Sequence, residues 1–247
     1  MRLTDRIHLV GSGEPDWAQS DPRDSQVYLV ATADGHVVVD TGTGRSLAAI
    51  LAEVARDGLL ADEIAWILLT HAHADHAGGG AAWRRAIPGA RIAAAAETAP
   101  WLAAADEEAT SVDRARAAGI YPADYRLEGF EVDRPLAGDD ELRVADLVFR
   151  AVPSPGHAAG HLAYLVNVDG ASTLFSGDAL FPGGRILLQG TWDCDLQAAL
   201  RTVERLAGLG AERLLAGHLA PVLDGAAAHF AAATERIARL LVPASIG

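Results

Sequence analysis

The sequence predicts an α/β fold, a four-layer αββα sandwich in which two β-sheets pack face to face between outer layers of helices. Two observations lead to this expectation. A β-rich stretch followed by alternating strand and helix patterns occurs once in the first half of the chain and again in the second half. The helical patterns have an apolar side, so the helices are expected to cover the sheets from outside. The 247 residues suit one domain, spanning 1–247.

The first half begins with a predicted β-hairpin over residues 26–42, where two β-rich runs flank a turn at Asp34-Gly35 and the second run ends at Asp40. Apolar residues at helical spacing then alternate with short continuous apolar runs, which are typical of buried strands. Gly58 and Pro88 each end a helix. In order, we expect a helix over 45–58, a strand over 64–70, a helix over 78–89, a strand over 90–97 and helical structure over 98–119.

The second half repeats this order. Its β-rich part is followed by an amphipathic helix, a short strand that leads to His218, and a closing helix. The expected elements are strands within 141–153, 161–168 and 172–178, a helix over 195–210, a strand over 213–218 and a helix over 225–241.

Composition excludes several classes of function. The net charge of −13 repels phosphate backbones and argues against nucleic acid as a partner. All 20 basic residues are arginine, so Schiff-base chemistry on a lysine is impossible. No apolar run approaches the roughly 18–20 residues of a membrane span, and the first residues show no export signal. We therefore expect a cytoplasmic protein without a membrane partner.

The stretch "LLTHAHADHAGG", residues 68–79, places three histidines and an aspartate in one loop after an apolar run. Three further polar residues also follow apolar β-type runs. Because rigid strands fix the loops that follow them, sites collect at strand ends. The candidate ligands are His71, His73, Asp75, His76, His157, Asp178 and His218.

Imidazole nitrogen and carboxylate oxygen suit zinc, iron or manganese better than calcium, which prefers oxygen alone. Seven such side chains exceed the needs of one four-coordinate ion and suit two divalent ions about 3.5–4 Å apart. Zinc is the expected metal, and iron and manganese accept the same ligands. The alternative is that the histidines are unrelated structural residues, which is how we interpret the isolated His8, His36 and His229.

The motifs "THAHADH", "SPGH", "SGD" and "AGH" resemble those of the metallo-β-lactamase superfamily, in the same order. The resemblance runs from Asp40 to His218 and includes glyoxalase II, lactonases and β-lactamases. It implies the αββα sandwich of that superfamily. It also implies that Asp178 bridges two metals, the first held by His71, His73 and His157 and the second by Asp75, His76 and His218.

The resemblance implies supporting roles as well. Asp40 is expected beneath the site, accepting an N–H from a ligand histidine and so fixing its tautomer; the alternative is an aspartate that caps a turn. His161 is expected to pack or hydrogen-bond near the ligands rather than bind metal. Cys194, the single cysteine, is expected at a helix start rather than as a ligand, and it excludes an intramolecular disulfide.

We expect a hydrolase in which two cations lower the pKa of a bridging water to about 7. The resulting hydroxide attacks an acyl carbonyl of a small molecule, while Asp75 orients the water and carries a proton to the leaving group. Thioesters, esters and lactones are the expected substrates. A β-lactamase is an alternative, less favoured because many zinc β-lactamases anchor the drug through lysine, which this chain lacks.

Two further alternatives remain open at this stage. One is a mononuclear iron oxygenase resembling persulfide dioxygenases, which share the fold and much of the ligand pattern. The other is a binding protein without catalysis, against which the complete ligand set argues.

A lid over the site is expected at about 106–130. Its aromatic residues Tyr121, Tyr125 and Phe130 either line an apolar substrate pocket or pack the lid down, and its exposed face is a possible homodimer contact.

Overall fold

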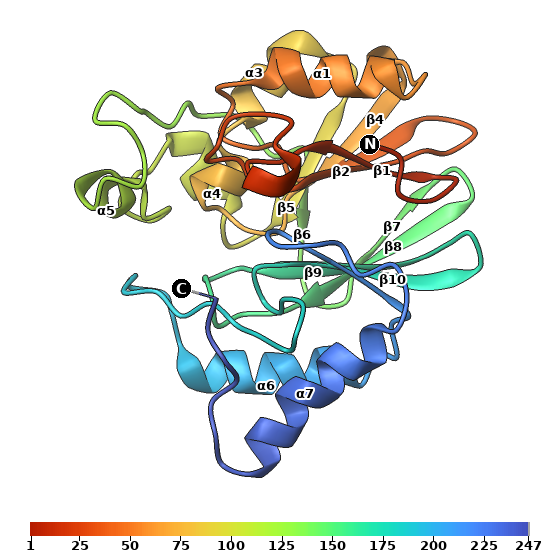
Figure 1. The fold of residues 1–247 in the computed structure, drawn as a ribbon. Coiled ribbons are helices and arrows are strands. Elements are labelled where there is room, and N and C mark those ends of the chain that lie inside the picture. Colours follow the sequence, from red (N-terminus) through yellow and green to blue (C-terminus); the bar gives the residue numbers. More distant parts are fainter. Residues whose placement is uncertain (247) are drawn as a thin grey trace.

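The computed structural model describes residues 1–246, which form two β-sheets packed between helices (Figure 1). The first sheet has six strands in chain order; its first three strands are antiparallel neighbours and its last four run parallel. These strands are β1 (Ile7–Gly11), β2 (Val27–Val30), β3 (His36–Val39), β4 (Ile64–Leu68), β5 (Arg91–Ala95) and β6 (Arg134–Leu136).

The second sheet has five strands in the order β11-β10-β9-β8-β7. Four of them pair antiparallel, and the last strand in the chain joins the sheet parallel to its neighbour. These strands are β7 (Glu141–Val144), β8 (Leu147–Pro153), β9 (Leu162–Val168), β10 (Ala171–Gly177) and β11 (Arg213–Ala216).

Four helices of the described chain cover the outer faces of the two sheets. Figure 1 shows α1 and α3 on the far side of the first sheet, and α6 and α7 on the far side of the second. The helices are α1 (Leu47–Arg56), α2 (Ala74–Ala77), α3 (Gly80–Ala86), α4 (Ala99–Ala104), α5 (Val112–Ala117), α6 (Leu196–Ala207) and α7 (Ala226–Ala238), with short 3₁₀ turns at Pro15–Trp17 and Ala61–Glu63. The predicted αββα sandwich is confirmed.

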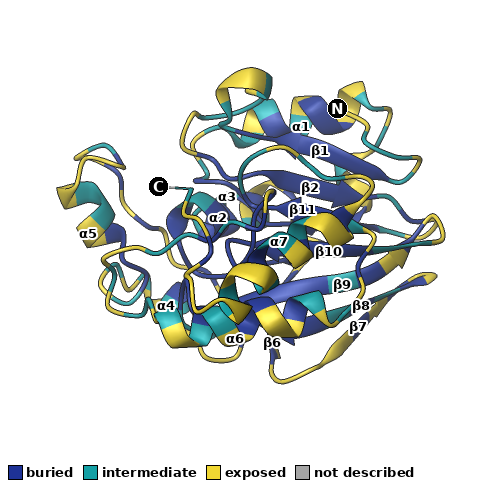
Figure 2. Ribbon diagram, turned by 60° about the horizontal axis from the view of Figure 1, so that its bottom comes forward, coloured by how far each residue is buried: buried dark blue, intermediate teal, exposed yellow. Residues whose placement is uncertain are grey.

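Strand residues alternate between two cores. In β2, Tyr28 and Val30 enter the core between the sheets, whereas Val27 and Leu29 enter the core under α1 and α3. Because both faces of such strands are buried, the strands appear in the sequence as continuous apolar runs. Figure 2 shows the same pattern, with the strands largely buried and the helices exposed on their outer sides.

The helical structure expected over 98–119 is divided into two short helices, α4 and α5. Ala105 ends α4 in the left-handed conformation. The side chain of Asp106 then accepts hydrogen bonds from the backbone N–H groups of Glu108 and Ala109. Such a local turn competes with helix continuation, and the periodicity of the alanine-rich segment does not reveal it. The strands β1 and β6 were not predicted.

The segment 106–130, expected as a lid, contains α5, which projects at the left of Figure 1. Val112, Tyr121, Tyr125 and Leu127 of this segment form a separate small core, and Ala74 of α2 belongs to that core. The segment therefore packs on the loop that carries the first candidate ligands.

Within the described residues, no helix has both the length and the apolar composition that a membrane span requires.

Candidate metal centre

The candidate ligands meet at one edge of the sandwich because they follow the ends of strands. Strand β4 leads into the loop that begins at Thr70, and α2 forms within that loop. On the second sheet, Asp178 follows β10 and His218 follows β11, which lies beside β10 and parallel to it. Carboxyl ends of adjacent parallel strands lie at the same edge of a sheet, which explains why residues so distant in sequence come together.

The ligand atoms fall into overlapping groups of three, and the atoms within each group lie within 4.8 Å of one another. Two groups have no member in common, and the third takes one residue from each of them and adds Asp178. The groups are His71, His73 and His157; Asp75, His76 and His218; and His71, His76 and Asp178. This division is the one that the superfamily resemblance implies.

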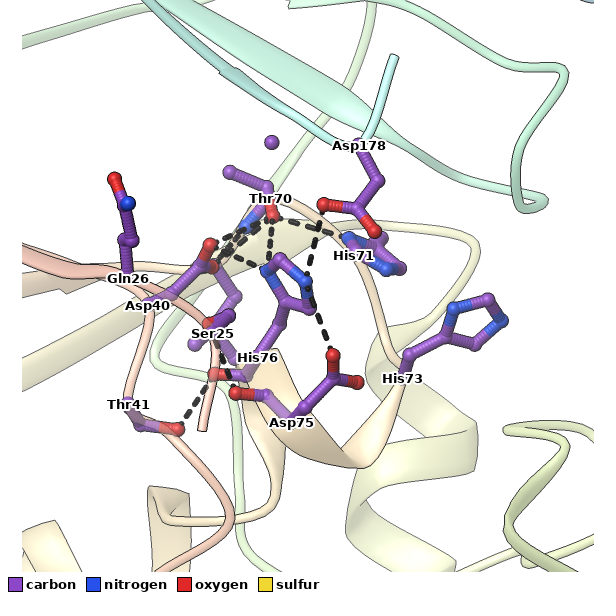
Figure 3. A network of polar contacts seen from close by, with 12 residues as sticks. Ser25, Gln26, Asp40, Thr41, Thr70, His71, His73, Asp75, His76 and Asp178 are labelled. Carbon is purple, nitrogen blue, oxygen red and sulfur yellow. Dashed lines mark hydrogen bonds and ion pairs between the residues drawn. The ribbon is translucent and has the colours of Figure 1, made fainter. Parts of the chain in front are cut away.

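Asp178 lies between the two groups. Its Oδ1 is 3.3 Å from Nε2 of His76, and its Oδ2 is 3.6 Å from Nε2 of both His157 and His218. In Figure 3 the carboxylates of Asp178 and Asp75 both face the ring of His76. A carboxylate in this position can contact a cation in each group.

The cluster fits a cation. Across the described chain, Nε2 of His71, Nε2 of His76 and Oδ1 of Asp178 are shielded from solvent and lack a hydrogen-bond partner. Unpaired buried polar atoms cost about 1–3 kcal/mol each. In addition, Nε2 of His157 lies 3.0 Å from Nδ1 of His73, an approach of two ring nitrogens that a shared cation would explain. The donor set matches the ligands that zinc, iron and manganese accept.

The electrostatics also suit metal binding. Burial, with its neighbour His76, lowers the pKa of His71 well below the ordinary histidine value, and burial beside His157 lowers the pKa of His73 to about 4. Burial alone would raise the pKa of Asp178, but His76 and His218 outweigh it and hold that pKa well below its ordinary value. At neutral pH these groups therefore have the free lone pairs and ionised carboxylates that metal ligands need.

His76 shows the reverse shift. Burial opposes its charged form, but the carboxylates of Asp178, Asp75 and Asp40 outweigh burial and raise its pKa well above the ordinary value. A cation bound at Nε2 of His76 would take the place of that proton.

Asp40 fixes the orientation of His76. Its Oδ2 lies 2.8 Å from Nδ1 of His76, and its Oδ1 accepts a hydrogen bond from the backbone N–H of Thr70. With Nδ1 bound to Asp40, Nε2 is the nitrogen that faces Asp178 and Asp75 (Figure 3). Asp40 itself has a φ of 63°, in the left-handed region that aspartate tolerates better than most residues.

His161 supports Asp178. The backbone N–H of Asp178 donates to Nε2 of His161 at 3.1 Å, so that nitrogen is an acceptor and the proton lies on Nδ1. Nδ1 in turn lies 2.8 Å from Oγ of Ser154. The lone pair on Nε2 is therefore occupied, and His161 positions Asp178 rather than completing a ligand group.

Two supporting contacts were not foreseen. Oε1 of Glu14 lies 3.6 Å from Nδ1 of His218 and accepts a hydrogen bond from the backbone N–H of Leu219. The hydroxyl of Tyr121 donates to Oδ1 of Asp75 at 2.9 Å. Glu14 lies in "GSGEPDW", which contains no pattern that would have revealed its role.

Among the three aromatic residues of segment 106–130, Tyr121 lines two cavities beside the ligand cluster. The hydroxyl of Tyr125 donates to the carbonyl of Thr43, and its ring packs in the small core of the lid. Phe130 belongs to the core beneath the first sheet, where it packs against Gly80. The packing alternative therefore describes Tyr125 and Phe130. Tyr121 packs in the same small core and also lines a cavity, so its place in a substrate pocket stays a prediction.

The remaining histidines and the cysteine lie apart from the ligand groups. His8 pairs with Asp57 at 2.7 Å, and Nδ1 of His229 accepts a hydrogen bond from the backbone N–H of Gly183. His36 pairs with Glu63 at 3.3 Å. Sγ of Cys194 accepts a hydrogen bond from the backbone of Gln189, just before α6.

The αββα sandwich and the cluster of histidines and aspartates at its edge define a metal-binding protein. The chain belongs to the metallo-β-lactamase superfamily, whose family model matches residues 20–218. This result confirms the resemblance inferred from the motifs.

Curated proteins that are similar to this chain have different descriptions. The chain is 29% identical over 218 residues to the lactamase-like protein vrtG of Penicillium aethiopicum, covering 88% of this chain and 58% of that protein. It is 31% identical over 162 residues to the hydroxyacylglutathione hydrolase of Albidiferax ferrireducens, covering 65% of this chain and 49% of that protein. The chain thus spans about half of the length of the curated relatives it matches.

Among solved structures, a subclass B3 metallo-β-lactamase of Bradyrhizobium japonicum is similar with a TM-score of 0.74 and 23% identity, covering 97% of this chain and 91% of that one. A likeness at this identity shows that the two chains share a fold.

Proposed function

We propose that the protein is a dinuclear metal-dependent hydrolase that cleaves the acyl bond of a small-molecule thioester, ester or lactone. The observation that carries the proposal is the division of the buried ligand atoms into two groups, with Asp178 between them. A single cation would leave one of the two groups without a partner.

The residues present fit two divalent cations, with zinc as the proposed metal. His71, His73 and His157 would hold one, Asp75, His76 and His218 the other, and Asp178 would contact both. When bound, such cations supply a water of lowered pKa and polarise a carbonyl oxygen. Asp40, His161 and Glu14 keep the ligands in position.

Asp75 is the residue we propose to move the proton. Its Oδ1 accepts a hydrogen bond from Tyr121, which leaves Oδ2 directed toward His218 at 3.3 Å and His76 at 3.6 Å. Asp75 also lines a cavity beside the cluster. A carboxylate held between the ligand cluster and a cavity can accept a proton from the attacking water and return it to the leaving group.

Thioesters are the first substrates to examine. Several curated relatives are named hydroxyacylglutathione hydrolase, and an acyl group joined to the thiol of glutathione is a thioester. In this chain, the cavity between the ligand cluster and segment 106–130 supports a small molecule as the substrate.

A combined metal and activity measurement tests the proposal. The purified protein is loaded with zinc, manganese or iron, its metal content is measured, and it is assayed with acyl thioesters, lactones, aryl esters and a chromogenic β-lactam. We expect about two ions per chain and turnover of thioester, ester or lactone. One iron per chain with oxygen uptake, or turnover of the β-lactam alone, would contradict the proposal.

Asp75→Asn provides the matching variant. We expect it to keep the fold and to lose at least about a hundredfold in kcat, the usual contribution of a positioned proton carrier. Parental turnover by this variant would show that Asp75 does not carry the proton.

A further inference from the structure

A cavity of about 410 Å³ lies beside the candidate metal centre. His73 and Asp75 contribute to its wall from the ligand cluster, and the lid and residues 189–191 contribute the rest. Sites for small molecules have volumes of about 300–1,000 Å³. A substrate whose carbonyl lies at the metal centre can therefore extend into this cavity.

One part of the wall is apolar. Ala115, Ala118 and Ile120 of the lid line the cavity together with the ring of Tyr121. Ile120 is 57% exposed, although large aliphatic side chains are usually buried. This part of the wall suits a hydrocarbon chain.

Another part of the wall has polar groups without partners. Ser111 is only 5% exposed, and its Oγ has no hydrogen-bond partner among residues 1–246. Ser111 immediately precedes α5, but its side chain does not cap that helix. Oγ1 of Thr191 is likewise shielded and unpaired within the same residues. Because buried hydroxyls are normally satisfied, the unmet hydrogen bonds of these two point to a partner that the described chain does not supply.

The cavity also has one positive charge. In the described chain, the guanidinium of Arg114 makes no hydrogen bond or ion pair, although it lines the cavity. By contrast, Arg116 on the same helix is bound to Glu107 and to the carbonyl of Tyr125. An arginine with free donors in the same cavity wall as two unpaired hydroxyls matches a carboxylate, which accepts several hydrogen bonds and has one negative charge.

We propose that the cavity recognises acyl compounds that carry a carboxylate, separated from the scissile carbonyl by an apolar chain. Arg114 binds the carboxylate, and Ser111 and Thr191 donate hydrogen bonds to it. This inference concerns the same site as the proposed hydrolase and rests on that function for its reaction, but the preference for an anion can be measured by binding alone.

The binding test uses dicarboxylates of increasing length, from succinate to pimelate, each compared with its monoamide. Calorimetric titration of the metal-loaded protein at pH 7.5 gives the affinities. We expect at least one dicarboxylate to bind about tenfold or more tightly than its monoamide, as for a hydrogen bond to a charged group.

Arg114→Gln should remove this difference. Arg143→Gln is the matched control, because Arg143 is exposed and its guanidinium also makes no hydrogen bond or ion pair in the described chain, but it lies on β7 outside the cavity wall. It should keep the parental preference. The proposal is overturned if the parent shows no preference at any length, or if the preference survives in Arg114→Gln, which would place the second carboxylate elsewhere.

Hydrolysis provides the second readout. Thioesters with a carboxylate at the end of the acyl chain or of the thiol are compared with their methyl-ended counterparts. Arg114→Gln should lower kcat/KM for a charged member at least about tenfold more than for its neutral counterpart. An equal change in both would count against Arg114. If the parent hydrolyses none of these thioesters, the hydrolase proposal is in question while the titration still decides the preference for an anion.

Discussion

Single side chains decide whether the cluster can hold cations, because each ligand must present the correct atom in the correct charge state. Asp40 binds Nδ1 of His76 and leaves Nε2 for the centre, and Glu14 lies at Nδ1 of His218 in the same way. Such outer contacts fix the tautomer and direction of a ligand ring. Their loss should weaken metal binding without removing a ligand.

Asp40→Asn tests this role. Asparagine tolerates the left-handed φ of 63° at this position, so we expect the fold to persist. Loss of the charge that holds His76 should weaken metal affinity by about 10- to 100-fold, as for other outer contacts of metal ligands. Competition with a chromogenic chelator measures the affinity. Asp34→Asn, in an exposed turn, is the control, and parental affinity in Asp40→Asn would contradict the assigned role.

Tyr121→Phe tests the hydrogen bond to Asp75. Tyr125 offers a matched control, because its ring lies 5.0 Å from that of Tyr121 and it is also buried, but its hydroxyl binds the carbonyl of Thr43. We expect Tyr121→Phe to reduce kcat about tenfold with unchanged metal content, since one hydrogen bond to a charged group is lost. Tyr125→Phe should retain the parental kcat. Equal losses in the two variants would indicate that the effect is structural.

The ligands and the supporting residues Asp40 and His161 could be predicted from the sequence, whereas Glu14 and the hydrogen bond from Tyr121 could not. Three histidines and an aspartate crowded into one loop are unusual enough to be noticed, and His157, Asp178 and His218 each follow an apolar run. Glu14 lies about 200 positions from His218, and no periodicity connects the two. Contacts of this kind depend on how loops pack and become evident only in three dimensions.

At the scale of elements, the ends of β10 and β11 bring Asp178 and His218 together, and little space remains between them. A Cβ built on Gly217 would overlap Oδ1 of Asp178. The φ of Gly217 lies outside the left-handed region, so the glycine is needed here for space and not for conformation.

Gly217→Ala is therefore expected to destabilise the protein by about 1–3 kcal/mol, the usual cost of overpacking, and to lower its metal content. Gly89→Ala is the control, since a Cβ there meets nothing within 4 Å and its φ is also outside the left-handed region. That change should alter stability by no more than about 0.5 kcal/mol. Urea unfolding and metal analysis measure both effects. Full metal content in Gly217→Ala would show that the centre can shift to accept the methyl group.

Most elements could be predicted from apolar spacing, because buried strands and amphipathic helices leave distinct patterns. The failure over 98–119 has a local cause: alanine-rich sequence fits a helix, yet the turn at Asp106 and the left-handed Ala105 interrupt it. The same interruption lets α5 project and form the wall of the cavity. The wall of the cavity was therefore the part of the site that sequence periodicity described least well.

For the molecule as a whole, the candidate ligands link the two halves of the sandwich. Those from the loop after β4 belong to the first sheet, and His157, Asp178 and His218 belong to the second. Cations that bind residues from both halves stabilise the folded state relative to the unfolded chain. Removal of metal should therefore lower the melting temperature. In the metal-free protein, the stability also depends on the charge state of the ligand side chains.

The stability of the metal-free protein should fall as the pH decreases from about 6.5 to about 4. Burial lowers the pKa of His71, His157 and His161 below the ordinary value of 6.5, and that of His73 to about 4. In this range the unfolded chain binds more protons than the folded chain, so the stability from these neutral imidazoles is lost on acidification.

The histidines whose pKa is raised affect the stability of the folded state in a different pH range. The pKa of His218 is raised to about 10, because carboxylates including Asp178 and Asp75 outweigh burial, and that of His76 is also raised. Their contribution is complete below pH 6.5 and is lost only as the pH rises toward the raised values. It does not offset the loss at acid pH. Thermal melts of chelator-treated protein between pH 7 and 4.5 check this expectation, and a constant melting temperature would contradict it.

Anomalous diffraction from crystals of the zinc-loaded protein tests most directly whether two cations occupy the edge of the sandwich. We expect two anomalous peaks about 3.5–4 Å apart, one contacted by His71, His73 and His157 and the other by Asp75, His76 and His218, with Asp178 between them. A single peak, or peaks remote from these side chains, would contradict the assignment of a dinuclear centre.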